Sequence, residues 1–153
     1  MADTNAPLYD RVAILGMGLI GSSIARALAQ HGLAGTIIGG DADPAVCEEA
    51  RSLGLAERME TDPVAAVQDA DLVVMAVPVG ACGALAEAMA PGLKPGAIVT
   101  DVGSVKAAVV RDVTEHLPEG VIFIPGHPNA GTEYSGPAAG FSSLFKDRYW
   151  ILT

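Results

Sequence analysis

The sequence predicts an α/β fold with a doubly wound, mainly parallel sheet. Short apolar runs alternate with longer segments of helical periodicity, which is the rhythm of βαβ units. Glycines and prolines fall between these segments, where turns are expected. The length of 153 residues suits one domain, and a hydrophobic fraction of 50% with 18% charged residues excludes a disordered chain.

The individual elements follow from the apolar runs and their boundaries. Strands are expected at residues 11–15, 36–38, 71–77, 97–100, 121–124 and 148–153. Helices are expected at residues 19–30, 43–53, 62–68, 79–89 and 105–116. Residues 125–140 read as a polar, glycine-rich loop with at most a short helix. We therefore divide the chain into an N-terminal tail, residues 1–10, and one domain, residues 11–153.

Charge and composition narrow the classes of partner. Nine basic against 18 acidic residues give a net charge of −9, which repels phosphate backbones and argues against a nucleic-acid partner. Cys47 and Cys82 have neither metal nor disulfide spacing. The start of the chain lacks the basic region of a signal peptide, and the longest uncharged stretch, residues 72–86, is too short to span a membrane. We expect a soluble, cytoplasmic protein without a metal site.

A glycine motif stands between the first expected strand and the first expected helix. Gly16-Met-Gly18-Leu-Ile-Gly21 matches G-x-G-x-x-G in the strand–turn–helix context that the motif requires. Gly16 permits the tight turn, Gly18 lets a pyrophosphate approach the backbone, and Gly21 lets the helix pack closely on the strand. An ordinary glycine-rich turn is the alternative. The context favours a Rossmann-like dinucleotide site.

Asp41 lies twenty residues after Gly21, at the end of the second expected strand. A carboxylate there accepts hydrogen bonds from the ribose hydroxyls and repels a 2′-phosphate, which favours NAD over NADP. Alternatively, Asp41 only belongs to a helix start at which Asp43 serves as the cap. The predicted cofactor-binding residues are Gly16, Gly18, Leu19, Ile20, Gly21, Asp41, Val77 and Pro78.

Three further positions follow strands on the side where ligands of doubly wound sheets bind. Val77-Pro78 ends the central strand, although a proline there also simply stops a strand. Ser104 follows the next strand, where it is either a helix N-cap or a ligand contact. His127 follows the strand after that, within the polar loop, and imidazole can take a proton near neutral pH. A solvated histidine is the alternative, and Glu133 is either a surface charge or a substrate contact.

These motifs together resemble the prephenate/arogenate dehydrogenases. The resemblance rests on Gly16–Ser22, Ala76–Pro78, Asp101–Lys106, His127–Gly136, Leu144-Phe145 and Trp150–Thr153, in the order of the family and over nearly the whole chain from Arg11. It implies oxidation and decarboxylation of prephenate to 4-hydroxyphenylpyruvate, or of arogenate to tyrosine, in tyrosine biosynthesis. By resemblance, His127 takes the proton of the ring hydroxyl, Ser104 hydrogen-bonds near that hydroxyl and the nicotinamide, and Glu133 lies at the substrate entrance.

The sequence departs from the family pattern in two ways. Asn129 stands where the family usually has an apolar residue. Family members also continue into a helical C-terminal domain that forms the homodimer and completes the substrate site, and this chain ends before it. Two alternatives remain at this point. One is a dehydrogenase of the same architecture that acts on 3-hydroxy acids or imines, from which His127 distinguishes this chain, and the other is a non-catalytic NAD-binding module.

Overall fold

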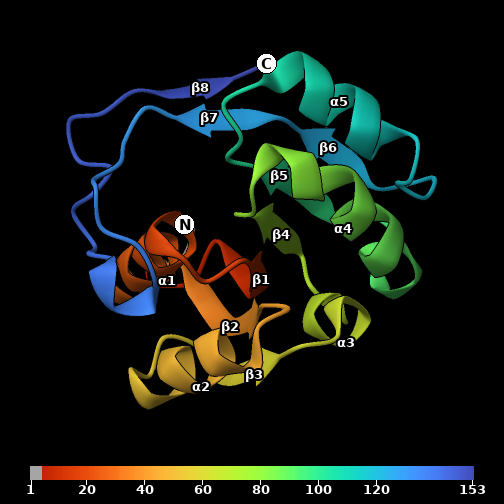
Figure 1. Cartoon of the computed structure of the whole chain (residues 1–153). Helices are drawn as coiled ribbons and strands as arrows, with labels where there is room; N and C mark the ends of the chain where they lie inside the picture. The colour runs from red at the N-terminus through yellow and green to blue at the C-terminus, as the bar shows by residue number, and fades with distance from the viewer. Residues whose placement is uncertain (1–4) are drawn as a thin grey trace.

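A six-stranded parallel sheet with the strand order β3-β2-β1-β4-β5-β6 forms the centre of the protein (Figure 1). The structure is a computed structural model and describes residues 5–153, so the first four residues of the expected tail lie outside it. The strands of this sheet are β1 (Tyr9–Leu15), β2 (Ala34–Gly40), β3 (Arg58–Glu60), β4 (Leu72–Met75), β5 (Ile98–Asp101) and β6 (Ile122–Ile124). A separate antiparallel pair is formed by β7 (Gly126–Pro128) and β8 (Trp150–Leu152).

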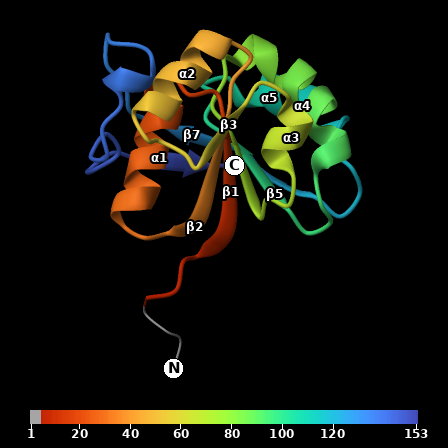
Figure 2. The same cartoon turned by 90° about the horizontal axis from the view of Figure 1, so that it is seen from below.

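Helices cover both faces of the sheet. They are α1 (Leu19–Gln30), α2 (Pro44–Ser52), α3 (Pro63–Val67), α4 (Cys82–Met89) and α5 (Lys106–Thr114), with short 3₁₀ turns η1 (Val79–Ala81), η2 (Ala90–Gly92) and η3 (Pro137–Ala139). Seen from below, α1 and α2 lie on one side of the strands and α3, α4 and α5 on the other (Figure 2). Within the described residues, no helix combines the length and the apolar character needed to cross a membrane.

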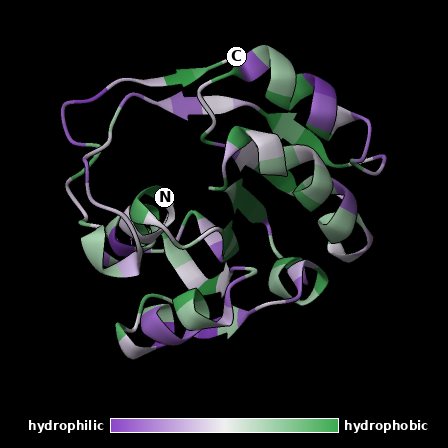
Figure 3. Cartoon of the chain, in the orientation of Figure 1, coloured by the Kyte–Doolittle hydropathy of each residue, from purple (hydrophilic) through white to green (hydrophobic). Residues whose placement is uncertain are grey.

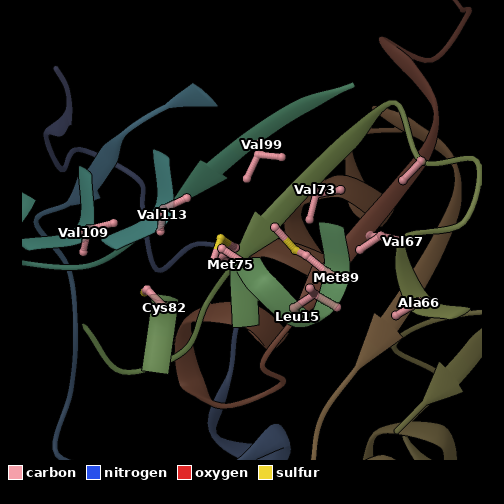
Figure 4. Packing of buried hydrophobic residues seen from close by; sticks show 13 residues of the cluster. Leu15, Ala66, Val67, Val73, Met75, Cys82, Met89, Val99, Val109 and Val113 are labelled. Carbon is pink, nitrogen blue, oxygen red and sulfur yellow. The ribbon is translucent and has the colours of Figure 1, made fainter. Parts of the chain in front are cut away.

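The alternation of side chains along β1 explains why the sheet is covered twice. Val12 and Ile14 pack into a core under α1 and α2, whereas Ala13 and Leu15 pack into the core under α3, α4 and α5. Figure 4 shows the second core, in which Leu15 lies near Met75 and Met89. Figure 3 shows β4 and β6 mainly in green, the hydrophobic end of its scale, whereas β7 is purple and white. A strand buried on both faces reads as a continuous apolar run, which is why β1 and β4 were recognisable.

The strand order reverses direction between β1 and β4. From β1 the chain proceeds outward to β2 and β3, then returns across the sheet to β4 and continues outward to β5 and β6. The helix that follows β1 and the helix that follows β4 lie on opposite faces of the sheet. A crevice therefore opens beyond the carboxyl ends of these two strands. This is a doubly wound, Rossmann-like sheet, as the sequence predicts.

The structure corrects several local expectations. β1 begins at Tyr9, within the expected tail, and β3 was not anticipated because it has three residues, of which only Met59 is buried. His127 lies in β7 rather than in a loop, since β7 finds a partner 22 residues later in β8. The closing strand is shorter than expected and pairs with β7, outside the main sheet.

Candidate functional site

The turn between β1 and α1 can be built only with glycines at two of its three motif positions. Gly16 has φ +94°, and a Cβ there would lie 2.2 Å from the Ala76 carbonyl oxygen. A Cβ on Gly21 would lie 1.8 Å from the carbonyl oxygen of Gly16. These glycines therefore serve the close packing of the turn on the neighbouring strand and helix.

Gly18 differs from the other two glycines. A Cβ added there would meet nothing within 4 Å, so the missing side chain leaves open space. Gly18 is also the N-cap of α1, and no side chain in residues 5–153 caps this helix end. The first N–H groups of a 12-residue helix are thus free to bind an anion in that space, aided by the helix dipole.

Asp41 holds the glycine turn from the end of β2. One carboxylate oxygen accepts the N–H of Met17 at 3.0 Å, and the other accepts the N–H of Asp43 at 3.0 Å. Asp43 in turn caps α2 by accepting the N–H of Ala45 at 2.9 Å, so the helix start does not need Asp41 as its cap. Asp41 remains half-buried and borders the crevice.

A cavity of ≈ 590 Å³ occupies the crevice beyond β1, β2 and β4. Gly16, Gly18, Asp41, Val77 and Pro78 all line it, so five of the eight predicted cofactor-binding residues come together there. Of the other three, Leu19 and Ile20 are half-buried on α1, Gly21 is buried against Gly16, and none of them lines the cavity.

The far wall of the cavity was not identified from the sequence. It is formed by Glu60 at the end of β3, by Thr61 and by Pro63 at the start of α3, and by Ala81, Ala84, Leu85 and Ala88 around α4. Small residues at helical spacing in α4 were the available signal, because they leave room beside a helix. Their spacing is equally typical of packing against another helix, so it identifies a site only once the sheet is in place.

His127 lies on β7, opposite Ile151 of β8. Its ring is half-buried, and its Nδ1 is fully buried without a hydrogen-bond partner among the described residues. The preceding residue, Gly126, donates its N–H to the carboxylate of Asp101 at the end of β5, at 3.1 Å. His127 is thereby held at the carboxyl edge of the sheet, although it does not line the cavity.

Ser104 and Glu133 are both exposed. The N-cap of α5 is Val105, without a side-chain hydrogen bond, so Ser104 is not the cap that its position also allowed. Ser104 follows Gly103, whose N–H donates to the carboxylate of Asp101 at 2.8 Å. The residues that precede Ser104 and His127 in the chain are thus both hydrogen-bonded to the same carboxylate. Glu133 lies in the stretch between β7 and η3, and neither residue lines the cavity.

The segment between β7 and β8 returns to α1. Arg26 of α1 donates to the Pro137 carbonyl at 2.9 Å, and the hydroxyl of Ser23 accepts the Phe141 N–H at 3.1 Å. Figure 1 shows the blue turn that contains η3 beside α1, and β7 and β8 at the top of the view. The chain that carries His127 and Glu133 is thus tied to the helix that follows the glycine turn.

A second, smaller hollow of ≈ 330 Å³ lies over β4, β5 and β8. Its lining residues are Tyr9, Leu72, Ile98, Thr100, Ile124, Trp150 and Leu152. None of these described residues carries a carboxylate, imidazole or amine, so they offer no group for acid–base chemistry.

Comparison with known proteins gives a consistent result. The profile of the family described as "Prephenate dehydrogenase, nucleotide-binding domain" matches residues 24–153. The cyclohexadienyl dehydrogenase of Zymomonas mobilis is 45% identical over 95% of this chain and 50% of its own length. The prephenate dehydrogenase of Bacillus subtilis is 35% identical over 95% of this chain and 40% of its own length.

Solved structures agree in fold and in sequence. Prephenate dehydrogenase from A. aeolicus, in complex with hydroxyphenyl propionate and NAD+, superposes with a TM-score of 0.85 at 36% identity, over 94% of this chain and 50% of its own. Synechocystis arogenate dehydrogenase has a TM-score of 0.84 at 32% identity, over 94% and 49%. The chain spans about half the length of these relatives. With its glycine turn, Asp41 and crevice in place, the chain belongs to the family of prephenate dehydrogenase nucleotide-binding domains.

Proposed function

We propose that this chain is the NAD-binding and proton-accepting part of a cytoplasmic enzyme of tyrosine biosynthesis. Its reaction is the oxidative decarboxylation of prephenate to 4-hydroxyphenylpyruvate, or of arogenate to tyrosine. The observation that carries the proposal is the position of two sites on one edge of the sheet. The glycine turn and Asp41 border the crevice, and His127 is fixed to the end of β5 on the same edge.

The residues of the crevice fit NAD. The uncapped start of α1 and the space at Gly18 suit the pyrophosphate, Asp41 suits the ribose hydroxyls, and Val77 and Pro78 border the same cavity. Leu19 and Ile20 complete the proposed contacts from α1. When bound, NAD supplies the acceptor for the hydride that leaves the ring carbon.

His127 is proposed to accept the proton of the ring hydroxyl. Since Nδ1 is buried, this transfer falls to Nε2 of the ring. Loss of the hydride and of this proton turns the ring C–OH into a carbonyl, after which the bond between the ring and its carboxylate breaks and CO₂ leaves. The electron pair of that bond makes the ring aromatic and turns the carbonyl into a phenolate, whose oxygen takes the proton back to give the phenol of the product. Ser104 is proposed to hydrogen-bond near the reacting hydroxyl, and Glu133 to lie at the substrate entrance.

The relatives are about twice as long as this chain, so the proposal assigns it a part of the machinery. By family resemblance, a helical C-terminal domain contributes the remainder of the substrate site and forms the homodimer. The acidic surface, with a net charge of −9, supports a small-molecule substrate rather than a nucleic acid.

The first experiment mixes the chain with NAD and prephenate, then with NAD and arogenate, and follows NADH by absorbance. Turnover with either substrate supports the proposal and identifies the substrate. If the chain binds NAD without turnover, it is joined to the C-terminal half of the Zymomonas mobilis relative and assayed again. If that fusion binds NAD but forms no NADH with either substrate, the result contradicts the proposal and favours a non-catalytic NAD-binding module.

Asp41→Ala is expected to weaken binding of NAD much more than binding of NADP. The substitution removes a charged acceptor for the ribose hydroxyls, worth about 1.5–3 kcal/mol or roughly tenfold or more in affinity. It also removes the repulsion of a 2′-phosphate. Dissociation constants for both cofactors, measured by titration calorimetry, check the ratio.

The ratio of the NAD and NADP dissociation constants is the decisive quantity, because the Asp41 carboxylate also accepts the backbone N–H groups of Met17 and Asp43. A purely structural loss weakens both cofactors equally, and that result would contradict a role in cofactor choice. Asp43→Ala is the matched control, since it removes a neighbouring carboxylate that only caps α2. It is expected to leave the ratio unchanged.

A further inference from the structure

We propose that the buried ion pair of Asp101 and Lys106 is the device that positions His127 for proton transfer. This inference rests on the proposed function and extends it to two residues that touch neither NAD nor substrate in that proposal. Asp101 ends β5 and is completely buried, and Lys106 is the first residue of α5 with a side chain 17% exposed. Their side chains form a salt bridge.

Both backbone polar groups of Gly126 are bound by this pair. The N–H of Gly126 donates to Oδ1 of Asp101 at 3.1 Å, and its carbonyl oxygen accepts from Nζ of Lys106 at 2.6 Å. The residue immediately before His127 is therefore held from both sides by opposite charges. Hydrogen bonds to charged groups are stronger than neutral ones, so the pair restrains this point of the chain firmly.

The direction of β7 explains why Gly126 needs these partners. The carbonyl of Pro125 accepts the N–H of Thr153, and the N–H of Asn129 donates to the carbonyl of Tyr149. Polar groups of alternate residues in a strand point to the same side, so those of Gly126 point away from β8. β7 has no other strand on that side among the described residues, and the ion pair satisfies the groups that a neighbouring strand would otherwise bind.

The same carboxylate also fixes the segment that carries Ser104. Oδ2 of Asp101 accepts the N–H of Gly103 at 2.8 Å. A Cβ on Gly103 would lie 3.0 Å from that oxygen, and a Cβ on Gly126 would lie 2.9 Å from Nε1 of Trp150. Glycine at both positions permits the close approach, so one buried carboxylate sets the starting points of both Ser104 and His127.

The cost of burying charges supports a positioning role. A buried ion pair is weak evidence for stability, because the desolvation of both charges offsets their attraction. Lys94 and Asp71 form a comparable pair at the opposite edge of the sheet, with Nζ and Oδ1 2.5 Å apart, and Asp71 likewise accepts a backbone N–H, that of Arg11, at 2.9 Å. That pair is partly exposed and far from the crevice, which makes it a matched control.

The test compares Lys106→Met with Lys94→Met in the form of the protein that turns over. Lys106→Met is expected to lower kcat by about 10²-fold, the effect of misplacing a catalytic group by about 1 Å, while the NAD dissociation constant stays unchanged. Lys94→Met is expected to leave both values unchanged. An unchanged kcat in folded Lys106→Met would overturn the proposal, and so would a parallel loss of kcat and NAD affinity, which indicates general structural damage.

A second variant covers the case in which an unpaired Asp101 prevents folding. Asp101→Asn combined with Lys106→Met removes both charges at once. The N–H groups of Gly126 and Gly103 bind different oxygens of Asp101, and asparagine replaces one of these oxygens with a donor NH₂ group. One of the two N–H groups therefore loses its acceptor, so hydrogen exchange at Gly126 or Gly103 should quicken relative to wild type. Unchanged exchange at both amides contradicts the proposal.

The exchange measurement does not depend on turnover, so it separates this inference from the proposed function. A fusion with the C-terminal half of the Zymomonas mobilis relative that binds NAD but oxidises neither substrate overturns the proposed function. Protected amides at Gly126 and Gly103 that are released in the double variant still support the ion pair as the anchor of the histidine strand. Lys94→Met combined with Asp71→Asn serves as the control for this measurement, and it should leave both amides protected.

Discussion

Replacing His127 with alanine is expected to lower kcat by roughly 10²- to 10⁴-fold, the contribution of a positioned general base. NAD affinity should change little, because His127 does not line the cavity that suits the cofactor. Steady-state kinetics with prephenate or arogenate measure kcat, and calorimetric titration measures NAD binding. A variant with wild-type turnover would show that another group takes the proton.

Two control substitutions test whether the loss of kcat is specific to the His127 side chain. His116→Ala removes an imidazole near the end of α5 that faces Glu115 at 3.4 Å, and it should leave kcat unchanged. Asn129→Ala removes an exposed side chain two residues from His127 while its backbone N–H still binds Tyr149. If Asn129→Ala changes KM for one substrate but not for the other, the unusual amide contributes to substrate choice rather than to proton transfer.

Gly18 and Gly21 are expected to respond to substitution in opposite ways. Gly18→Val should weaken NAD by about 10- to 100-fold, because its side chain would fill the space proposed for the pyrophosphate. The free energy of unfolding should fall by no more than about 1 kcal/mol, the cost of a poor N-cap residue. Cofactor titration and urea denaturation of the same variant check both values.

Gly21→Ala should instead reduce stability. Its Cβ would lie 1.8 Å from a backbone oxygen, that of Gly16, which cannot move aside as a flexible side chain can. We expect a loss of roughly 1–3 kcal/mol or more in the free energy of unfolding. Equal stability of the Gly18 and Gly21 variants would contradict the distinction between open space at one glycine and close packing at the other.

Local signals were sufficient for most of the fold. The helix at residues 19–30 has the predicted bounds, because glycines end the elements on both sides of it and its apolar face is regular. Asp43 and Asp62 each cap the helix that was expected to start there, since an N-cap acts within two or three residues. The short strand β3 was not predicted, because a single buried residue, Met59, gives no recognisable periodicity of hydrophobic residues.

The candidate site was harder to predict, because it depends on contacts between distant residues. Gly16, Gly18 and Asp41 were found from spacing alone, since the strand–turn–helix unit sets their positions. The role of Lys106 depends on Gly126, twenty residues later, and on a buried Asp101. Sequence patterns report the period of an element, but they do not report which backbone group a charged side chain reaches.

The pairing of β7 with β8 determines when the strand that carries His127 can form during synthesis. The cofactor crevice draws on residues up to Ala88, so its parts leave the ribosome early. The strand that carries His127 gains its partner only when Trp150–Leu152 have emerged, because β8 is the only strand that pairs with β7 among the described residues. The residues of the crevice can therefore come together in a nascent chain before the strand that carries His127 is paired.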